Sequence, residues 1–236
     1  MERAKRIILQ VGMAILVIAV WVMSPTYAHP ETYKIKNFKT ALQPDNITCG
    51  PTSAFMVLEH HQISTNLDEV KAKTKTEWFD IDGHKIGMTS PDYIVAAMKN
   101  YGLKASLRIG ELKEIKYYVS KGRPVIVLLR SGKWTWHYVV VIGYDKDGIW
   151  IANPASGAEE KISTEIFLSS WNFKTDMGGN KVVDICSFCN GLGQIFPTIL
   201  GKCDVCGGTG IAGDFLNRLI QAADIKPNTY IEVRKK

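Results

Sequence analysis

Apolar runs in the second half of the 236-residue sequence constrain the fold most strongly. From Gly122 onward, the segments RPVIVLL, WTWHYVVVIGYD and GIWIANP are rich in Val, Ile, Trp and Tyr, which favour β-strands. The runs VIVLL and YVVVIG are apolar at successive positions, so both faces of these strands need to be covered. Asp147 and Gly148 form a turn signal between the last two segments. The sequence therefore predicts central strands of a sheet, the last two joined as an antiparallel hairpin.

Helical patterns come earlier in the chain. A helix is predicted to begin near Cys49, because Pro51 suits a first helical turn and TSAFMVLEHH contains good helix formers. A second helix is predicted after Ser90, with Pro91 in its first turn and Gly102 at its end. Helices followed by an antiparallel sheet predict an α+β domain.

The N-terminus has the pattern of an export signal. A basic start, MERAKR, precedes an apolar run over residues 7–23, and Thr26 and Ala28 have the spacing that a signal peptidase reads. Residues 1–28 are therefore predicted to be a signal peptide, with an uncleaved membrane anchor through residues 7–23 as the alternative. Both interpretations place the rest of the chain outside the cytoplasm, in a periplasm or secreted, and the second keeps it membrane-anchored.

The charge pattern argues against one class of partner. Lys and Arg outnumber Asp and Glu by 29 to 23, but the basic residues are scattered along the chain. They form no basic stripe interleaved with aromatic residues, so we expect no nucleic-acid binding.

A lone cysteine, a histidine and an asparagine form the first candidate site. At a helix start, backbone N–H groups and the helix dipole are expected to lower the pKa of the Cys49 thiol, which suits a nucleophile. His137 begins a predicted strand and Asn153 ends the next one, so the hairpin brings both to one edge of the sheet. There, the Asn153 side chain could accept a hydrogen bond from the imidazole of His137 and fix its tautomer. Gln43 precedes Cys49 by six residues and could join the Cys49 N–H as an oxyanion donor.

Five segments together resemble a known family. They are Gln43, CGPTS at 49–53, GRPV at 122–125, HYVVVIG at 137–143 and IANPA at 151–155. This set is similar to the C39-like branch of papain-like cysteine peptidases, and the likeness extends over residues 31–175. The resemblance implies a papain-like fold, with Cys49 as nucleophile, His137 as base, Asn153 as orienting residue and Gln43 as oxyanion donor. That family more often has Asp where Asn153 stands.

The resemblance implies an exported peptidase domain over residues 29–177 that hydrolyses peptide or protein substrates through an acyl-enzyme. Related domains on transporters cleave leader peptides after paired glycines, but this sequence contains no transporter segment, so we do not expect that substrate to carry over. Two alternatives stay open. One is a papain-like transferase that uses the same acyl-enzyme, as in phytochelatin synthesis. The other is a catalytically silent peptide-binding protein built around the cysteine-rich segment described next.

Four clustered cysteines form the second candidate site. Cys186 and Cys189, then Cys203 and Cys206, occur in two copies of C-x-x-C-x-G-x-G. The pattern predicts one structural Zn²⁺ per chain held by four thiolates, in a module over residues 178–212. It resembles the zinc-binding region of DnaJ-type co-chaperones, which has four copies rather than two. The alternatives are two disulfides or a redox-active pair. A helix and a strand are predicted at 213–236.

Overall fold

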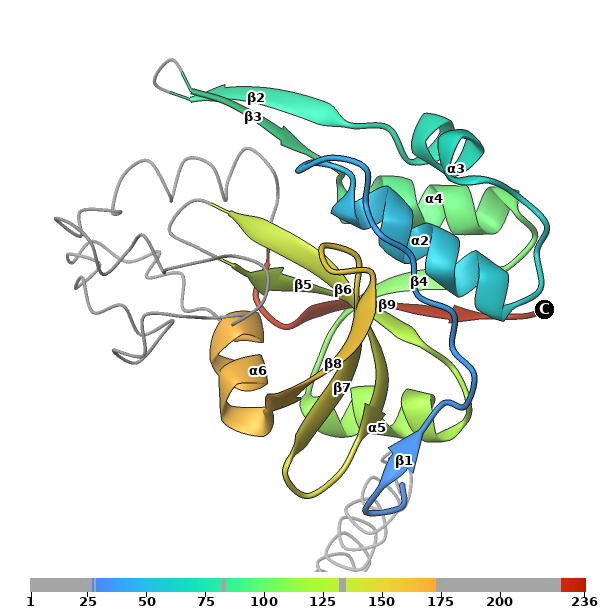
Figure 1. The fold of residues 1–236 in the computed structure, drawn as a ribbon, viewed down its shortest axis with the longest axis vertical. Coiled ribbons are helices and arrows are strands. Elements are labelled where there is room, and N and C mark those ends of the chain that lie inside the picture. The colour runs from blue at the N-terminus through green and yellow to red at the C-terminus, as the bar shows by residue number, and fades with distance from the viewer. Residues whose placement is uncertain (1–26, 28, 82–83, 132–134, 173–225) are drawn as a thin grey trace, which may run out of the picture.

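A seven-stranded antiparallel sheet forms the centre of the fold, with helices packed around it (Figure 1). The fold is that of a computed structural model, which describes residues 27, 29–81, 84–131, 135–172 and 226–236. The strands are β1 (Tyr33–Lys34), β2 (Glu77–Ile81), β3 (His84–Met88), β4 (Lys104–Ile109), β5 (Val125–Arg130), β6 (Trp136–Tyr144), β7 (Gly148–Asn153), β8 (Ala158–Ser163) and β9 (Thr229–Arg234). The helices are α2 (Cys49–His60), α3 (Leu67–Thr74), α4 (Pro91–Asn100), α5 (Leu112–Ser120) and α6 (Thr164–Trp171).

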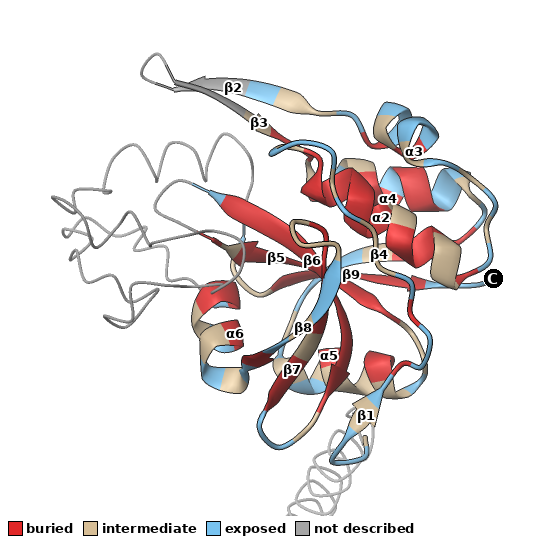
Figure 2. Ribbon diagram, in the orientation of Figure 1, coloured by how far each residue is buried: buried red, intermediate tan, exposed pale blue. Residues whose placement is uncertain are grey.

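Both faces of the central strands are covered, as their apolar runs predict. The sheet order is β4-β9-β5-β6-β7-β8, and β1 pairs with the far end of β6. β6 is buried along its whole length, and β5 is buried except at its last residue (Figure 2). α2 packs on β6 and α4 on β4, while α5 and α6 pack on β5 and its neighbours from the other side (Figure 1). The core therefore lies on both sides of β5 and β6.

The predicted hairpin is confirmed. β6 and β7 pair antiparallel, with Val140 opposite Ala152. The Asp145 carboxylate closes their turn by accepting from the N–H groups of Asp147 at 2.8 Å and Gly148 at 3.0 Å. This side-chain turn explains why the chain reverses at the predicted position.

Both predicted helices are also confirmed. α2 begins at Cys49, and the Thr52 N–H donates to the carbonyl of Thr48 just before the helix. α4 follows Ser90 with Pro91 in its first turn, and Gly102 after it adopts a φ of +82°. That left-handed conformation suits glycine and lets the chain leave the helix.

The order of elements differs from helices followed by a sheet. A two-stranded hairpin, β2–β3, lies between α3 and α4, and β4 precedes α5. The strand predicted near the C-terminus is present as β9, and it lies in the main sheet between β4 and β5. The main sheet thus includes a strand that follows the four clustered cysteines, and the domain boundaries at 177 and 212 stay predictions.

Two predicted features fall outside the part of the chain that the structure describes. The export signal at 1–28 does so, apart from Tyr27, and so does the cysteine-rich segment at 178–212. Among the helices that the structure describes, none has the length and apolar character to cross a membrane.

Candidate active site

Cys49 lies in the first turn of α2, where this turn contacts β6. The thiol is buried, with 9% of the residue exposed. Burial raises the pKa of the Cys49 thiol, and the backbone N–H groups of Tyr138, Gly50 and Cys49 itself oppose this only in part. The expectation that the helix start lowers the thiol pKa is therefore wrong, because the cost of burying a thiolate exceeds what these N–H groups return.

Tyr138 connects α2 to the strand that carries His137. Its backbone N–H interacts with the Cys49 sulfur and acts to lower the pKa of the thiol. Its ring lies against Gly50, where an added Cβ would be 3.2 Å from the ring. The buried Tyr138 hydroxyl donates to the carbonyl of Thr89 at 2.9 Å. These contacts place the thiol beside the residue that follows His137 in β6.

His137 and Asn153 meet as the hairpin predicts. The Nε2 atom of His137 lies 2.8 Å from Oδ1 of Asn153, and both residues are buried. Because a carbonyl oxygen only accepts, Nε2 carries the proton and Nδ1 is the basic nitrogen of the neutral ring. Burial lowers the pKa of His137, while the hydrogen bond with Asn153 and the negative charge of Glu160 act to raise it.

The sheet register explains this meeting. Because Val140 lies opposite Ala152, Asn153 is diagonal to His137 on the same face of the hairpin. The Oδ1 atom of Asn153 also accepts from the Ala155 N–H at 3.0 Å, and Nδ2 donates to Glu160 at 3.1 Å. The asparagine is thus held by three hydrogen bonds and is fully buried.

Gln43 lies beside both parts of the site. Its backbone N–H donates to the carbonyl of Pro154 at 2.7 Å, which attaches it to the end of β7. Its side-chain Nε2 donates to the carbonyl of Asp45 at 2.6 Å, within the loop that leads to α2. Gln43 Oε1 is buried and has no hydrogen-bond partner among the residues that the structure describes.

All four clustered cysteines lie outside the described residues, so the zinc site stays a prediction. Within the ranges that the structure does describe, no group of three or more His, Cys, Asp or Glu residues is placed to hold a metal ion.

Sequence reasoning missed Glu160 and Tyr138. Glu160 comes from β8, whose sequence AEEKIS has one buried residue and gives no functional signal. Tyr138 follows His137 in an apolar run and has the pattern of a core residue. A partial signal for Glu160 was the tight turn after Asn153, which returns the chain to the same edge of the sheet.

Comparison with known proteins settles the family. Residues 35–177, more than half of the chain, match the Peptidase_C39 like family. The chain belongs to this family. It therefore contains a C39-family cysteine peptidase domain, which confirms the resemblance drawn from its motifs.

Individual relatives are distant. A 143-residue region is 27% identical to the Lactococcin transport/processing ATP-binding protein LcnC-like of Lactococcus lactis subsp. lactis strain IL1403, and covers 59% of this chain but 18% of that protein. This chain thus spans less than a fifth of that relative. A Bacillus anthracis structure described as a C39-like peptidase matches with a TM-score of 0.53 at 16% identity, over 88% of this chain and 99% of the other. That match shows a shared fold. The peptidase domain of Streptococcus ComA, described as a bi-functional ABC transporter involved in quorum sensing, matches at 24% identity with a TM-score of 0.47, over 57% and 93%.

Proposed function

We propose that this domain hydrolyses peptide bonds with Cys49 as nucleophile, His137 as acid and base, and Asn153 as the residue that orients the imidazole. One observation carries the proposal: the buried 2.8 Å hydrogen bond from His137 to Asn153, on the strand that contacts the thiol-bearing end of α2. Family membership supplies the reaction class. Nucleophile, base and orienter are the three parts that this chemistry needs.

The proton moves as the bond to sulfur forms. Burial raises the pKa of Cys49 and lowers that of His137, so the two groups rest as neutral thiol and neutral imidazole. As sulfur attacks the peptide carbonyl carbon, the thiol proton passes to Nδ1 of His137. His137 then protonates the leaving amine, which gives an acyl-enzyme. In the second half, His137 takes a proton from water, and the resulting hydroxide releases the carboxylic acid and the thiol.

Each half of the reaction forms a negatively charged oxygen, which needs hydrogen-bond donors. Nε2 of Gln43 carries two hydrogens, and the Asp45 carbonyl accepts one of them. We propose that the second hydrogen, together with the Cys49 N–H, donates to this oxyanion. Such fixed donors in a buried site stabilise developing charge strongly.

The proposal also covers the substrate class, the location of the protein and the bound metal, each of which is supported by the sequence or the family. Peptide or protein substrates fit a cysteine peptidase family. The pattern of residues 1–28 supports export, with either a cleaved signal or a membrane anchor. The two C-x-x-C-x-G-x-G copies support one structural Zn²⁺ bound by Cys186, Cys189, Cys203 and Cys206.

The test compares Cys49→Ala with a matched control. Ser53→Ala changes a buried residue one helical turn later in α2, whose hydroxyl has no hydrogen-bond partner among the described residues. Full-length protein and both variants are incubated with a peptide library, and cleavage products are measured by mass spectrometry. We expect Ser53→Ala to cleave normally and Cys49→Ala to lose at least about 10³-fold, since no nucleophile remains.

Each other result has a meaning. Undiminished cleavage by Cys49→Ala would refute the proposal. An acyl-enzyme on Cys49 that transfers its acyl group to amines faster than to water would identify a transferase instead. Peptide binding without any acylation of Cys49 would favour a silent binding protein.

A further inference from the structure

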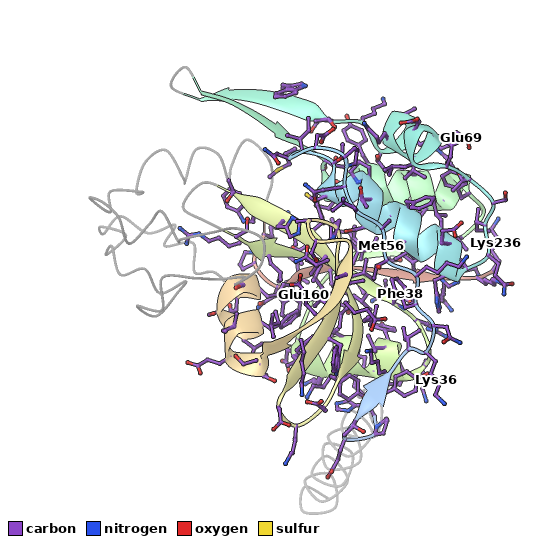
Figure 3. The ribbon with its side chains drawn as sticks, viewed as in Figure 1. Lys36, Phe38, Met56, Glu69, Glu160 and Lys236 are labelled. Atoms are coloured by element: carbon purple, nitrogen blue, oxygen red, sulfur yellow. The ribbon has the colours of Figure 1, made fainter. Side chains whose placement is uncertain are left out.

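Glu160 lies directly behind the His137–Asn153 pair. It comes from the edge strand β8, opposite Ile151 of β7, and is labelled in Figure 3. One carboxylate oxygen, Oε2, accepts from Nδ2 of Asn153 at 3.1 Å. The other, Oε1, accepts from the Ser156 hydroxyl at 2.6 Å. The side chain is partly buried, so this carboxylate is held on both sides and not simply solvated.

The hydrogen bonds of Asn153 fix which way its amide faces. Oδ1 accepts from two N–H groups, those of His137 and Ala155, and Nδ2 faces Glu160. A rotation of the amide by 180° would point Nδ2 at two donors and Oδ1 at a carboxylate. Because the Ala155 N–H only donates and an ionised carboxylate only accepts, Ala155 and Glu160 together exclude the rotated form. The correct imidazole tautomer of His137 therefore depends on a residue that does not touch it.

We propose that Glu160 is a positioning residue of this active site, which holds the Asn153 amide oxygen toward His137. Through Asn153 it also supplies the negative charge that a carboxylate at position 153 would supply directly. This inference rests on the function proposed above. Asn153 is neutral, so it orients the imidazole without stabilising an imidazolium by charge. The Glu160 carboxylate adds that stabilisation across the asparagine, and it acts to raise the pKa of His137 against the effect of burial.

The arrangement predicts an unusual dependence between positions 153 and 160. In Asn153→Asp, the new carboxylate would face Glu160 across the 3.1 Å contact that now holds a hydrogen bond. Two carboxylates this close cannot both ionise readily, so one would hold a proton or move away. In the double variant Asn153→Asp/Glu160→Gln, the new amide at position 160 can donate to the new carboxylate at position 153. Removal of the charge at position 160 should thus impair the natural protein but improve the Asn153→Asp protein.

The test uses two readouts that need no known substrate. The first is the rate constant for alkylation of Cys49 by iodoacetamide as a function of pH, resolved from the other cysteines by mass spectrometry. The second is the pH titration of His137 by NMR in full-length Cys49→Ala protein. Glu159→Gln is the matched control: it makes the same charge change on β8, but Glu159 pairs with Lys34 at 2.7 Å.

We expect Glu160→Gln to move the His137 titration to lower pH and to slow alkylation at neutral pH several-fold. Glu160→Ala should slow alkylation about tenfold, as expected for loss of a hydrogen bond to a charged group. Asn153→Asp should also be slow, and Asn153→Asp/Glu160→Gln should recover to within about threefold of the natural protein. Glu159→Gln should leave both readouts unchanged.

Two results would overturn the inference. One is a pKa of His137 that is the same in Glu160→Gln as in Glu159→Gln, whatever the alkylation rates are. Glu160 would then only stabilise the turn after Asn153. The other is an Asn153→Asp protein that Glu160→Gln fails to improve. In both cases Cys49→Ala still decides the proposed function separately, through peptide cleavage.

Discussion

Gly50 is the position where one added methyl group tests the site most directly. A Cβ at this residue would lie 3.0 Å from Cβ and 3.3 Å from Cγ2 of Thr89, and 3.2 Å from Cδ2 of Tyr138. Ordinary contacts begin at 3.4 Å, so in Gly50→Ala the first turn of α2 and its neighbours Thr89 and Tyr138 must separate by a few tenths of an ångström. The same turn carries Cys49, which would lose its contact with the Tyr138 N–H.

The stability cost of Gly50→Ala should be small. Overpacking costs about 1–3 kcal/mol, and the better helix propensity of Ala returns up to about 1 kcal/mol. We therefore expect the free energy of unfolding to fall by up to about 2 kcal/mol. The catalytic rate should be more sensitive to this shift than the stability is. A displacement of about 1 Å in a reacting group can cost about 100-fold, so a shift of a few tenths should lower kcat/KM about tenfold.

The assay measures urea unfolding and Cys49 alkylation in Gly50→Ala, Thr89→Gly and the double variant. Thr89→Gly removes two of the three close contacts, so the double variant should recover part of the lost alkylation rate relative to Thr89→Gly alone. If Gly50→Ala alkylates and cleaves within about twofold of the natural protein, the geometry of α2 against β6 does not set the reactivity of the thiol, and the reasoning fails.

Two further predictions concern metal and pH. If the four clustered cysteines bind zinc, metal analysis of the full chain should find about one zinc, and Cys203→Ser should lose it while Cys49 alkylation persists. A metal-free protein with two disulfides by mass would contradict this. Burial also lowers the pKa of His61 from 6.5 to about 4, so the folded state resists protonation. Unfolding then takes up a proton, and stability is full above pH 6.5 and falls as pH drops toward 4, by up to about 3 kcal/mol from this residue. The free energy of unfolding, measured with urea at pH 7 and pH 4.5, should differ less between the two pH values in His61→Leu than in the natural protein. An equal difference would exclude His61 as a source of this pH dependence.

The parts that sequence predicted correctly are set by local signals. Cys49 begins a helix because Pro51 suits its first turn, and the hairpin follows from an Asp-Gly turn between apolar runs. Once the hairpin exists, strand register alone brings His137 to Asn153. The meeting of His137 and Asn153 was thus predictable from residues that are close in the chain.

The parts that sequence missed depend on contacts between distant segments. The thiol pKa is raised because α2 is packed against β6, and the extent of burial is not readable from a helix start. The β2–β3 hairpin lies outside the main sheet and has no strong apolar alternation. Glu160 looks like one of several surface charges on β8 until the register places it behind Asn153. In each case tertiary packing decides what a local pattern leaves open.

The segment that contains the four cysteines joins two points that the fold already holds together. The Asn228 N–H donates to the carbonyl of Trp171 at 3.0 Å, and the indole Nε1 of Trp171 donates to the carbonyl of Thr229 at 2.8 Å. Trp171 is fully buried, with its ring 6.4 Å from that of Tyr230 on β9. Core contacts between α6 and β9 therefore offset the entropy of closing this long connection, and a metal need not do so. Cys49, His137 and Asn153 come instead from α2, β6 and β7. If the four cysteines do bind zinc, we therefore expect its loss to weaken the connecting segment first and the reactivity of Cys49 last.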